Sequence, residues 1–190
     1  MFRVFAYACL VAGCLVSASV SSVAQENVHA LTGTVSSINS VAKTITVLQD
    51  NGSQGVFADL TNAKTRISFD KHIAAETTAA DAFDKKGAYA IVFYVGDVGA
   101  QSVVALKSLG SGPFSATIGT LEKIDNRDHS ISVEDKSGAV QTFKINAQTV
   151  AEGAMGVEVG LKFQAEKGDQ VRVVSTTVDG APTALFLREM

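Results

Sequence analysis

Cysteine, tryptophan and clustered basic residues are scarce in this chain of 190 residues, and each scarcity excludes a class of chemistry. The only two cysteines, Cys9 and Cys14, lie near the amino terminus, and there is no tryptophan. If a leader that contains both cysteines is removed, the remaining chain has none. Disulfides, thiolate catalysis and cysteine-based metal sites are then excluded together.

Basic residues are too scattered to form a phosphate-binding surface. Lys85-Lys86 is the only adjacent pair of lysine or arginine, and the formal net charge of -3 becomes -4 if Arg3 leaves with the leader. Binding to nucleic acid or to anionic lipid depends on clustered Lys and Arg side chains. Nucleic acid is therefore not expected as a partner of this acidic chain.

Familiar catalytic motifs are also missing from the sequence. It contains no Gly-x-Ser-x-Gly elbow, no glycine-rich phosphate loop before a helix and no His-Glu-x-x-His run. Serines and threonines are plentiful, but on strands such residues usually form the wet face. We expect a non-enzymatic protein, and we assign no catalytic, cofactor-binding or metal-ligating residues and no cofactor.

Residues 1–24 have the pattern of a secretory signal peptide. Arg3 supplies a positive start, Val4–Val16 is apolar, and Ser22–Ala24 is a small-x-small cleavage site. The apolar run is shorter than the roughly 20 residues that a spanning helix needs, so no transmembrane span is expected in the mature chain. We expect a periplasmic or secreted protein. The alternative is a lipoprotein, because Val11–Cys14 resembles a lipoprotein box that would lipidate Cys14.

The same pattern occurs twice in the remaining chain, 86 residues apart. Gly33–Val47 is GTVSSINSVAKTITV, and Gly119–Val133 is GTLEKIDNRDHSISV. Both stretches end in the alternation of polar and apolar residues that is typical of a strand with one buried face. A polar connection of hairpin length precedes that alternation. Each copy is therefore predicted to contain two strands and a turn.

The two copies keep the same register as far as Phe57 and Phe143, and then diverge in a link before two more β-rich runs each. Five strands with a longer link after the third is the order of an OB-type barrel. The predicted fold is mainly β, with two tandem five-stranded OB-like antiparallel barrels and a short helix in the first copy. Residues 25–110 form β-barrel repeat 1 and residues 111–190 form β-barrel repeat 2, with Gly110–Pro113 as the boundary.

The two links, residues 68–86 and 151–167, differ, and any specific binding is expected to lie in them and on the barrel face beside them. Asp70–Lys86 is rich in alanine, which predicts the short helix. The alternative for this link is structural, with Ile73 and Phe83 closing the bottom of the first barrel.

Three groups of residues are candidate binding sites. His72 and Glu76, with Asp70 nearby, have the spacing of a metal pair on a helix, but a solvated helix start explains them better. Asp125, Asp128 and His129 share a hairpin loop in which turn chemistry suffices. Tyr89, Phe93 and Tyr94 would make a small stacking surface, but core packing of the first barrel is favoured.

The chain resembles a family of exported bacterial proteins of unknown function that are built from small OB-like β-barrel repeats. The resemblance is carried by Gly-Thr-Val/Leu, Ile-Asn/Asp, Ile-x-Val and Gly168–Val173, although Gly87–Tyr89 lacks the matching Asp. It implies an exported β protein and supplies no catalytic residues. A more distant similarity, to periplasmic copper-binding OB barrels, fails because those rely on a His, Met and Trp cluster.

We therefore expect an exported cell-envelope protein that acts as a binding or interaction module for an unknown envelope protein or small ligand. A periplasmic metal carrier and an unrecognised envelope enzyme remain as alternatives.

Overall fold

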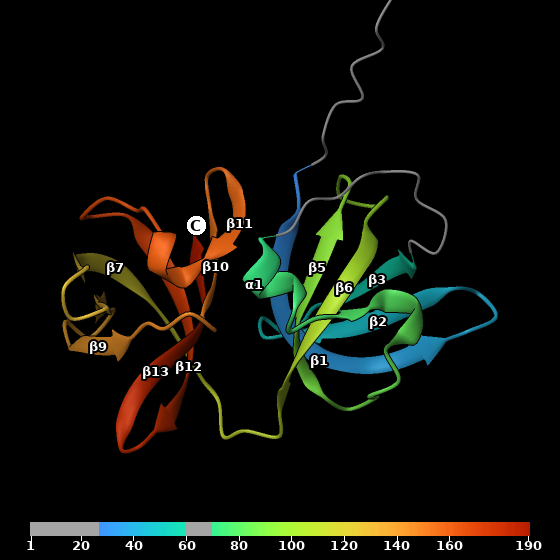
Figure 1. Ribbon diagram of the computed structural model, residues 1–190, viewed down its shortest axis with the longest axis horizontal. Coiled ribbons are helices and arrows are strands. Elements are labelled where there is room, and N and C mark those ends of the chain that lie inside the picture. The colour runs from blue at the N-terminus through green and yellow to red at the C-terminus, as the bar shows by residue number, and fades with distance from the viewer. Residues whose placement is uncertain (1–26, 60–69) are drawn as a thin grey trace, which may run out of the picture.

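A computed structural model describes residues 27–59 and 70–190 as two β-sheets that lie side by side and are joined by one extended connection (Figure 1). The chain is mainly β, as predicted. The leader, with Cys9 and Cys14, and residues 68 and 69 of the first link lie outside the described residues. We call residues 27–110 the first unit and residues 111–190 the second unit.

The first unit is a closed five-stranded barrel. Its strands pair in the order β3, β2, β1, β5, β6, and a short parallel pairing of β3 with β6 closes the ring. A two-residue strand, β4, is added to the outer side of β6. The strands are β1 (His29–Asn39), β2 (Thr44–Gln49), β3 (Gln54–Asp59), β4 (Thr78–Ala79), β5 (Tyr89–Val95) and β6 (Ser102–Gly110).

The second unit is a seven-stranded sheet in which β11, β10, β13, β12, β7, β8 and β9 are neighbours in that order. A single parallel pair, Thr183 with Lys144, also joins β13 to β9. The strands are β7 (Ser115–Asp125), β8 (Ser130–Asp135), β9 (Val140–Lys144), β10 (Val150–Gly153), β11 (Gly156–Val159), β12 (Gln170–Val178) and β13 (Ala181–Glu189).

The first hairpins of the two units have the same strand register. Val35 pairs with Val47 and Leu121 with Val133, and in each hairpin a bulge follows the first residue of that pair. The glycine that opens each pattern is needed because the partner strand crosses close to it. A Cβ on Gly119 would lie 2.1 Å from the carbonyl oxygen of Glu134, closer than atoms can approach.

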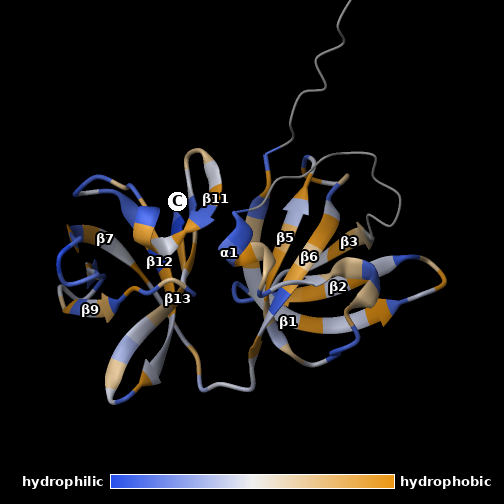
Figure 2. Ribbon diagram, viewed as in Figure 1, coloured by the Kyte–Doolittle hydropathy of each residue, from blue (hydrophilic) through white to orange (hydrophobic). Residues whose placement is uncertain are grey.

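Each unit has its own hydrophobic core made from the inward residues of the alternating strands. In the first unit Val35, Ile45 and Phe57 are buried, and in the second unit Ile131 and Phe143 are buried. Hydrophobic residues alternate with hydrophilic ones along most strands (Figure 2), whereas β5 is buried at every position after its first. That difference marks a strand with both faces covered.

The links adopt less helix and more strand than the sequence predicts. The alanine-rich link contains one helical turn, α1 (Lys71–Ala74), and a 3-10 turn, η1 (Ala80–Ala82). The helix ends early because β-branched threonines follow it, and Thr78 pairs with Leu106 of β6 instead. The second link, in which the sequence predicts no strand, folds as the β10–β11 hairpin followed by a 3-10 turn, η2 (Gly160–Lys162).

Phe83 is buried in the core of the first barrel, as the structural interpretation of the first link predicts. Ile73 is buried elsewhere, in an apolar cluster that contains residues of both units. Within residues 27–59 and 70–190, no helix has the length and apolar character needed to cross a membrane.

We predict that Gly119→Ala destabilises the protein by about 1 to 3 kcal/mol or more, the usual cost of forcing extra atoms into a packed position. Gly153→Ala is the matched control, because the nearest atom to its Cβ would be the flexible end of the Glu158 side chain, at 3.3 Å, and the next atoms would be at 3.9 Å and 4.0 Å. Urea titration measures both. Equal stability of the two variants would show that the close crossing at Gly119 is wrong.

Candidate functional site

The residues weighed as a metal pair do not converge. Asp70 caps α1 by accepting a hydrogen bond from the backbone N–H of His72 (2.9 Å), and its other oxygen lies 3.0 Å from Lys162 Nζ. The pKa of Asp70 is lowered mainly by the backbone hydrogen bond from His72 and further by the hydrogen bond from Lys162. Glu76 pairs with Lys107. These carboxylates therefore have structural partners in the contact between the units.

The loop of the second hairpin has the turn chemistry that the sequence suggested. One carboxylate oxygen of Asp125 accepts hydrogen bonds from the backbone N–H groups of Arg127 and Asp128, both at 3.1 Å, and the other pairs with Lys123. His129 has a positive φ of 46°. Within the described part of the chain, no group of three or more His, Cys, Asp or Glu side chains is placed to hold a metal ion.

The aromatic residues of β5 do not form one stacking surface. Tyr94 points into the first barrel, against Phe57. Phe93 is fully buried, but in the cluster between the units rather than in the barrel core that the sequence favoured. Tyr89 stacks on Phe114 of the second unit, with ring centroids 4.8 Å apart.

The two units meet through a shared apolar cluster. On the sheet of the second unit, four residues from neighbouring strands lie in one line across the sheet, and we call them the apolar row: Val174, Phe186, Val150 and Val159. They pack against the outer face of β5 and the start of β1, which supply the apolar side chains of Ile91, Phe93, Val95, Val28 and Ala30. Burial of this apolar surface favours docking of the units into one body.

A charged row lies two residues further along the same strands. Arg172 of β12 is the cross-strand partner of Arg188 of β13, and Arg188 is the partner of Glu152 of β10. Because side chains two residues apart share a face, the charged row faces the first unit just beyond the apolar row. On the other side of Arg172 lies Ile118 of β7.

Arg172 connects the two units through a polar network. Its Nη1 donates a hydrogen bond to Thr32 Oγ1 (2.9 Å), and its Nη2 pairs with Asp50. Asp50 Oδ2 also accepts hydrogen bonds from Thr32 Oγ1 (2.8 Å) and from the Tyr89 hydroxyl (2.7 Å). The pKa of Tyr89 is raised to about 12, mainly by burial of the phenol and further by its hydrogen bond to Asp50 and the negative charge of that residue.

Glu152 forms a second polar network across the same contact. Its Oε1 lies 3.0 Å from His29 Nδ1 of the first unit. Its Oε2 lies 3.2 Å from Arg188 Nε but makes no hydrogen bond, and this oxygen is buried. Burial, followed by the negative charge of Glu152, raises the pKa of the neighbouring Tyr94.

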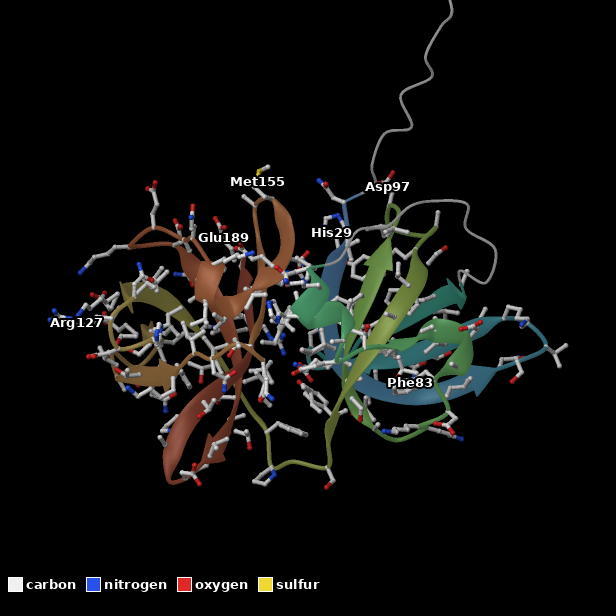
Figure 3. All side chains as sticks on the ribbon, viewed as in Figure 1. His29, Phe83, Asp97, Arg127, Met155 and Glu189 are labelled. Atoms are coloured by element: carbon white, nitrogen blue, oxygen red, sulfur yellow. The ribbon has the colours of Figure 1, made fainter. Side chains whose placement is uncertain are left out.

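A cleft of about 630 Å³ opens beside these networks. The first unit lines it with Leu31, Thr32 and the Gln49–Asn51 turn, and the second unit lines it with Ala116, Ile118, Arg172 and the end of β13. A smaller hollow of about 310 Å³ adjoins it across Arg188–Met190 and is lined by His29 and Glu152. His29 and Glu189 both lie at the upper part of the contact between the units (Figure 3). The cleft is the candidate site.

Residues of β6 and of both links make further hydrogen bonds at the contact. Lys107 donates to Glu76 and to the backbone carbonyl of Gln148 in the second unit (2.6 Å). The backbone N–H of Val157 donates to the carbonyl of Val28 (3.2 Å). The link residues therefore serve the docking of the units, and the hairpin of the second link also forms a wall of the smaller hollow.

Sequence reasoning missed this site, since it treated the two copies separately. One signal for it exists: the uninterrupted apolar run Tyr89–Val95 indicates a strand that is covered on both faces. Val171–Val174 carries the same signal, interrupted only by Arg172. No pattern in the sequence pairs Asp50 with Arg172, which are 122 residues apart.

Comparison of the chain with protein-family models and with curated proteins gives no match.

We predict that the Asp50–Arg172 pair has a coupling energy of about 1 to 3 kcal/mol in a double-mutant cycle with alanine, as expected for contacting residues in a hydrogen-bonded network. The side chain of Arg172 is only 14% exposed, and that of Asp50 is only 24% exposed. The exposed pair Lys123–Asp125 is the control and is expected to give a smaller coupling energy, because solvent screens it. Coupling no larger than that of the control would remove Arg172 as a connection between the units.

We predict a pH effect of Tyr89 that appears only in alkaline solution. The folded pKa of about 12 exceeds the ordinary value of 10.0, so the contribution of Tyr89 to stability is complete below pH 10 and is lost as the pH rises through 12. Ultraviolet absorbance follows ionisation of the phenol. The native protein and Tyr94→Phe are expected to show a transition near pH 12 that Tyr89→Phe lacks; retention of that transition in Tyr89→Phe would assign it elsewhere.

Proposed function

We propose that this protein is an exported, non-enzymatic binding module that consists of two tandem OB-type barrels and holds a small ligand in the cleft between them. Export rests on the leader pattern of residues 1–24, with its apolar run and small-x-small site. Residues 25–110 and 111–190 are the two repeats. The proposal also follows the resemblance of the sequence pattern to that of exported OB-like proteins.

Duplication of one barrel is supported by the correspondence between the first hairpins. The paired residues Val35–Val47 and Leu121–Val133 and the two bulges occur at the same places in the pattern. Strand β9 contacts β13 in the second unit as β3 contacts β6 in the first. The inserted β10–β11 hairpin then distinguishes the second copy, because it extends the sheet at β13 and widens the surface that meets the first unit.

The observation that carries the binding role is the composition of the cleft. Its volume of about 630 Å³ falls within the range of roughly 300 to 1,000 Å³ that small-molecule sites occupy. Both units contribute to its walls, and charged side chains stand beside apolar ones such as Leu31 and Ile118. Ligand sites have this mixture of apolar wall and few oriented polar groups, and they occur preferentially between domains.

A binding role also fits the chemistry of the charged residues better than catalysis does. Arg172 and Asp50 are held by one another, and Glu152 is held between His29 and Arg188. No serine, threonine or lysine nucleophile stands beside His29 among the residues that line the smaller hollow in the described chain. Acyl transfer needs such a nucleophile together with its base.

We predict that filling the cleft abolishes ligand binding without unfolding the protein. Ala116 is exposed and lines the cleft, so Ala116→Trp occupies space that a ligand needs. In a screen of small molecules by melting temperature, a ligand at 100 times its dissociation constant stabilises the native protein by about 2.7 kcal/mol. Ala116→Trp should lose this gain.

The control is Ala42→Trp, which adds the same side chain to the exposed tip of the first hairpin. It should respond to ligands as the native protein does. Ligands that stabilise Ala116→Trp fully would place binding outside the cleft, and the absence of any stabilising small molecule would favour a protein partner from the cell envelope instead.

A further inference from the structure

Arg172 and Arg188 are cross-strand neighbours with different hydrogen bonding. Both terminal nitrogens of Arg172 have partners, since one donates to Thr32 and the other pairs with Asp50. Arg188 approaches Glu152 only with Nε, at 3.2 Å. Among the described residues, none accepts a hydrogen bond from the terminal nitrogens of Arg188. Arg172 therefore positions the units, and Arg188 retains donors for a ligand.

Arg188 also stands where both hollows meet. It lines the cleft of about 630 Å³ and the adjoining hollow of about 310 Å³, and its side chain is 39% exposed. Glu152, which is 7% exposed, forms an ion pair with the Nε side of the guanidinium. A guanidinium whose two terminal N–H groups are free offers the parallel pair of donors that a carboxylate accepts in a bidentate contact.

The other walls of the cleft limit the charge and shape of a ligand. Asp50 and Glu189 line the cleft and would repel an anion with two charges about twice as strongly as an anion with one. Ala116 and Ile118 provide an apolar wall next to Arg172, and Ile118 is 41% exposed. The chemistry therefore favours one negative charge and an apolar body of moderate size.

We propose that the cleft binds a monocarboxylate with an apolar body, and that Arg188 holds the carboxylate. The apolar body lies along Ala116 and Ile118. This inference rests on the proposed binding role of the cleft and names the class of ligand. Arg188 is the specificity-determining residue, whereas Arg172, Asp50 and Thr32 act as positioning residues that keep the second wall in place.

The test measures the affinity of the purified protein for three probes by calorimetry. Octanoate has one carboxylate and an apolar chain, octanol has the same chain without charge, and inorganic phosphate has charge without an apolar chain. Octanoate is expected to bind more tightly than either of the other probes. Arg188→Gln should raise the dissociation constant for octanoate at least about tenfold, which corresponds to about 1.4 kcal/mol.

Two further variants separate the contact from general effects. Arg188→Lys keeps the charge without the planar pair of donors, and it should weaken octanoate binding less than Arg188→Gln does. Arg127→Gln removes the same charge from the outer loop of the second unit, far from the cleft (Figure 3), and should leave binding unchanged. Melting temperatures of all variants show that they are folded.

Several results would overturn the proposal. Octanol that binds as tightly as octanoate would mean that the carboxylate is not recognised, although the cleft itself still binds ligands. Equal weakening by Arg127→Gln would assign the effect to overall charge. A third result is that no monocarboxylate binds, octanoate included, whereas a neutral or cationic molecule binds and Ala116→Trp blocks its binding. In that case the ligand class is wrong and the binding role of the cleft stands. If Ala116→Trp blocks nothing, both proposals fail.

Discussion

Burial of Phe93 and Phe186 in the apolar cluster that the two units share is the interaction on which the arrangement of the whole molecule depends. Both side chains are completely buried, and neither belongs to the core of its own unit. Removing a buried phenylalanine side chain typically costs about 3 to 5 kcal/mol, which is a large part of the stability of a small domain. The two units are therefore expected to behave as one folded body, and the cleft is a consequence of how they dock.

Polar contacts surround this apolar centre and fix how the units are oriented. Arg172 and Glu152 lie on one side of it, and Lys107 lies on the other. Ion pairs add little to the stability of a protein when they are exposed. The buried pairs here act mainly by fixing the orientation of the two units. The hydrogen bonds of Thr32 and Tyr89 to Asp50 complete the partners of a carboxylate that would otherwise be costly to bury.

The local pattern of the sequence was sufficient to predict the strands outside the two links, but not how the units dock. Alternation in Thr44–Val47 and Ser130–Val133 identified β2 and β8, and the turns Asn39–Lys43 and Asp125–His129 fell where hairpin loops were expected. These features depend on residues near one another in the chain. Gly110–Pro113 covers the last residue of β6 and most of the connection to β7.

The elements that the sequence analysis predicted incorrectly, or did not predict, depend on residues that are distant in the chain. The alanine-rich link has a single helical turn because Thr78 pairs with β6, and Ile73 leaves the barrel for the contact between the units. The β10–β11 hairpin forms where β13 offers an edge and where Val28 accepts a hydrogen bond. Arg188 carried no signal in the sequence, since its neighbours in the cleft come from β1, β2 and β7.

Amide hydrogen exchange at increasing urea concentration, followed by mass spectrometry, tests most directly whether the units form one body around the cleft. Protection of β2 reports on the first unit, and protection of β8 reports on the second. The docked arrangement predicts that both strands lose protection at the same urea concentration, and that Phe93→Ala lowers this midpoint for both. Separate midpoints in the native protein, or a Phe93→Ala effect confined to β2, would contradict it.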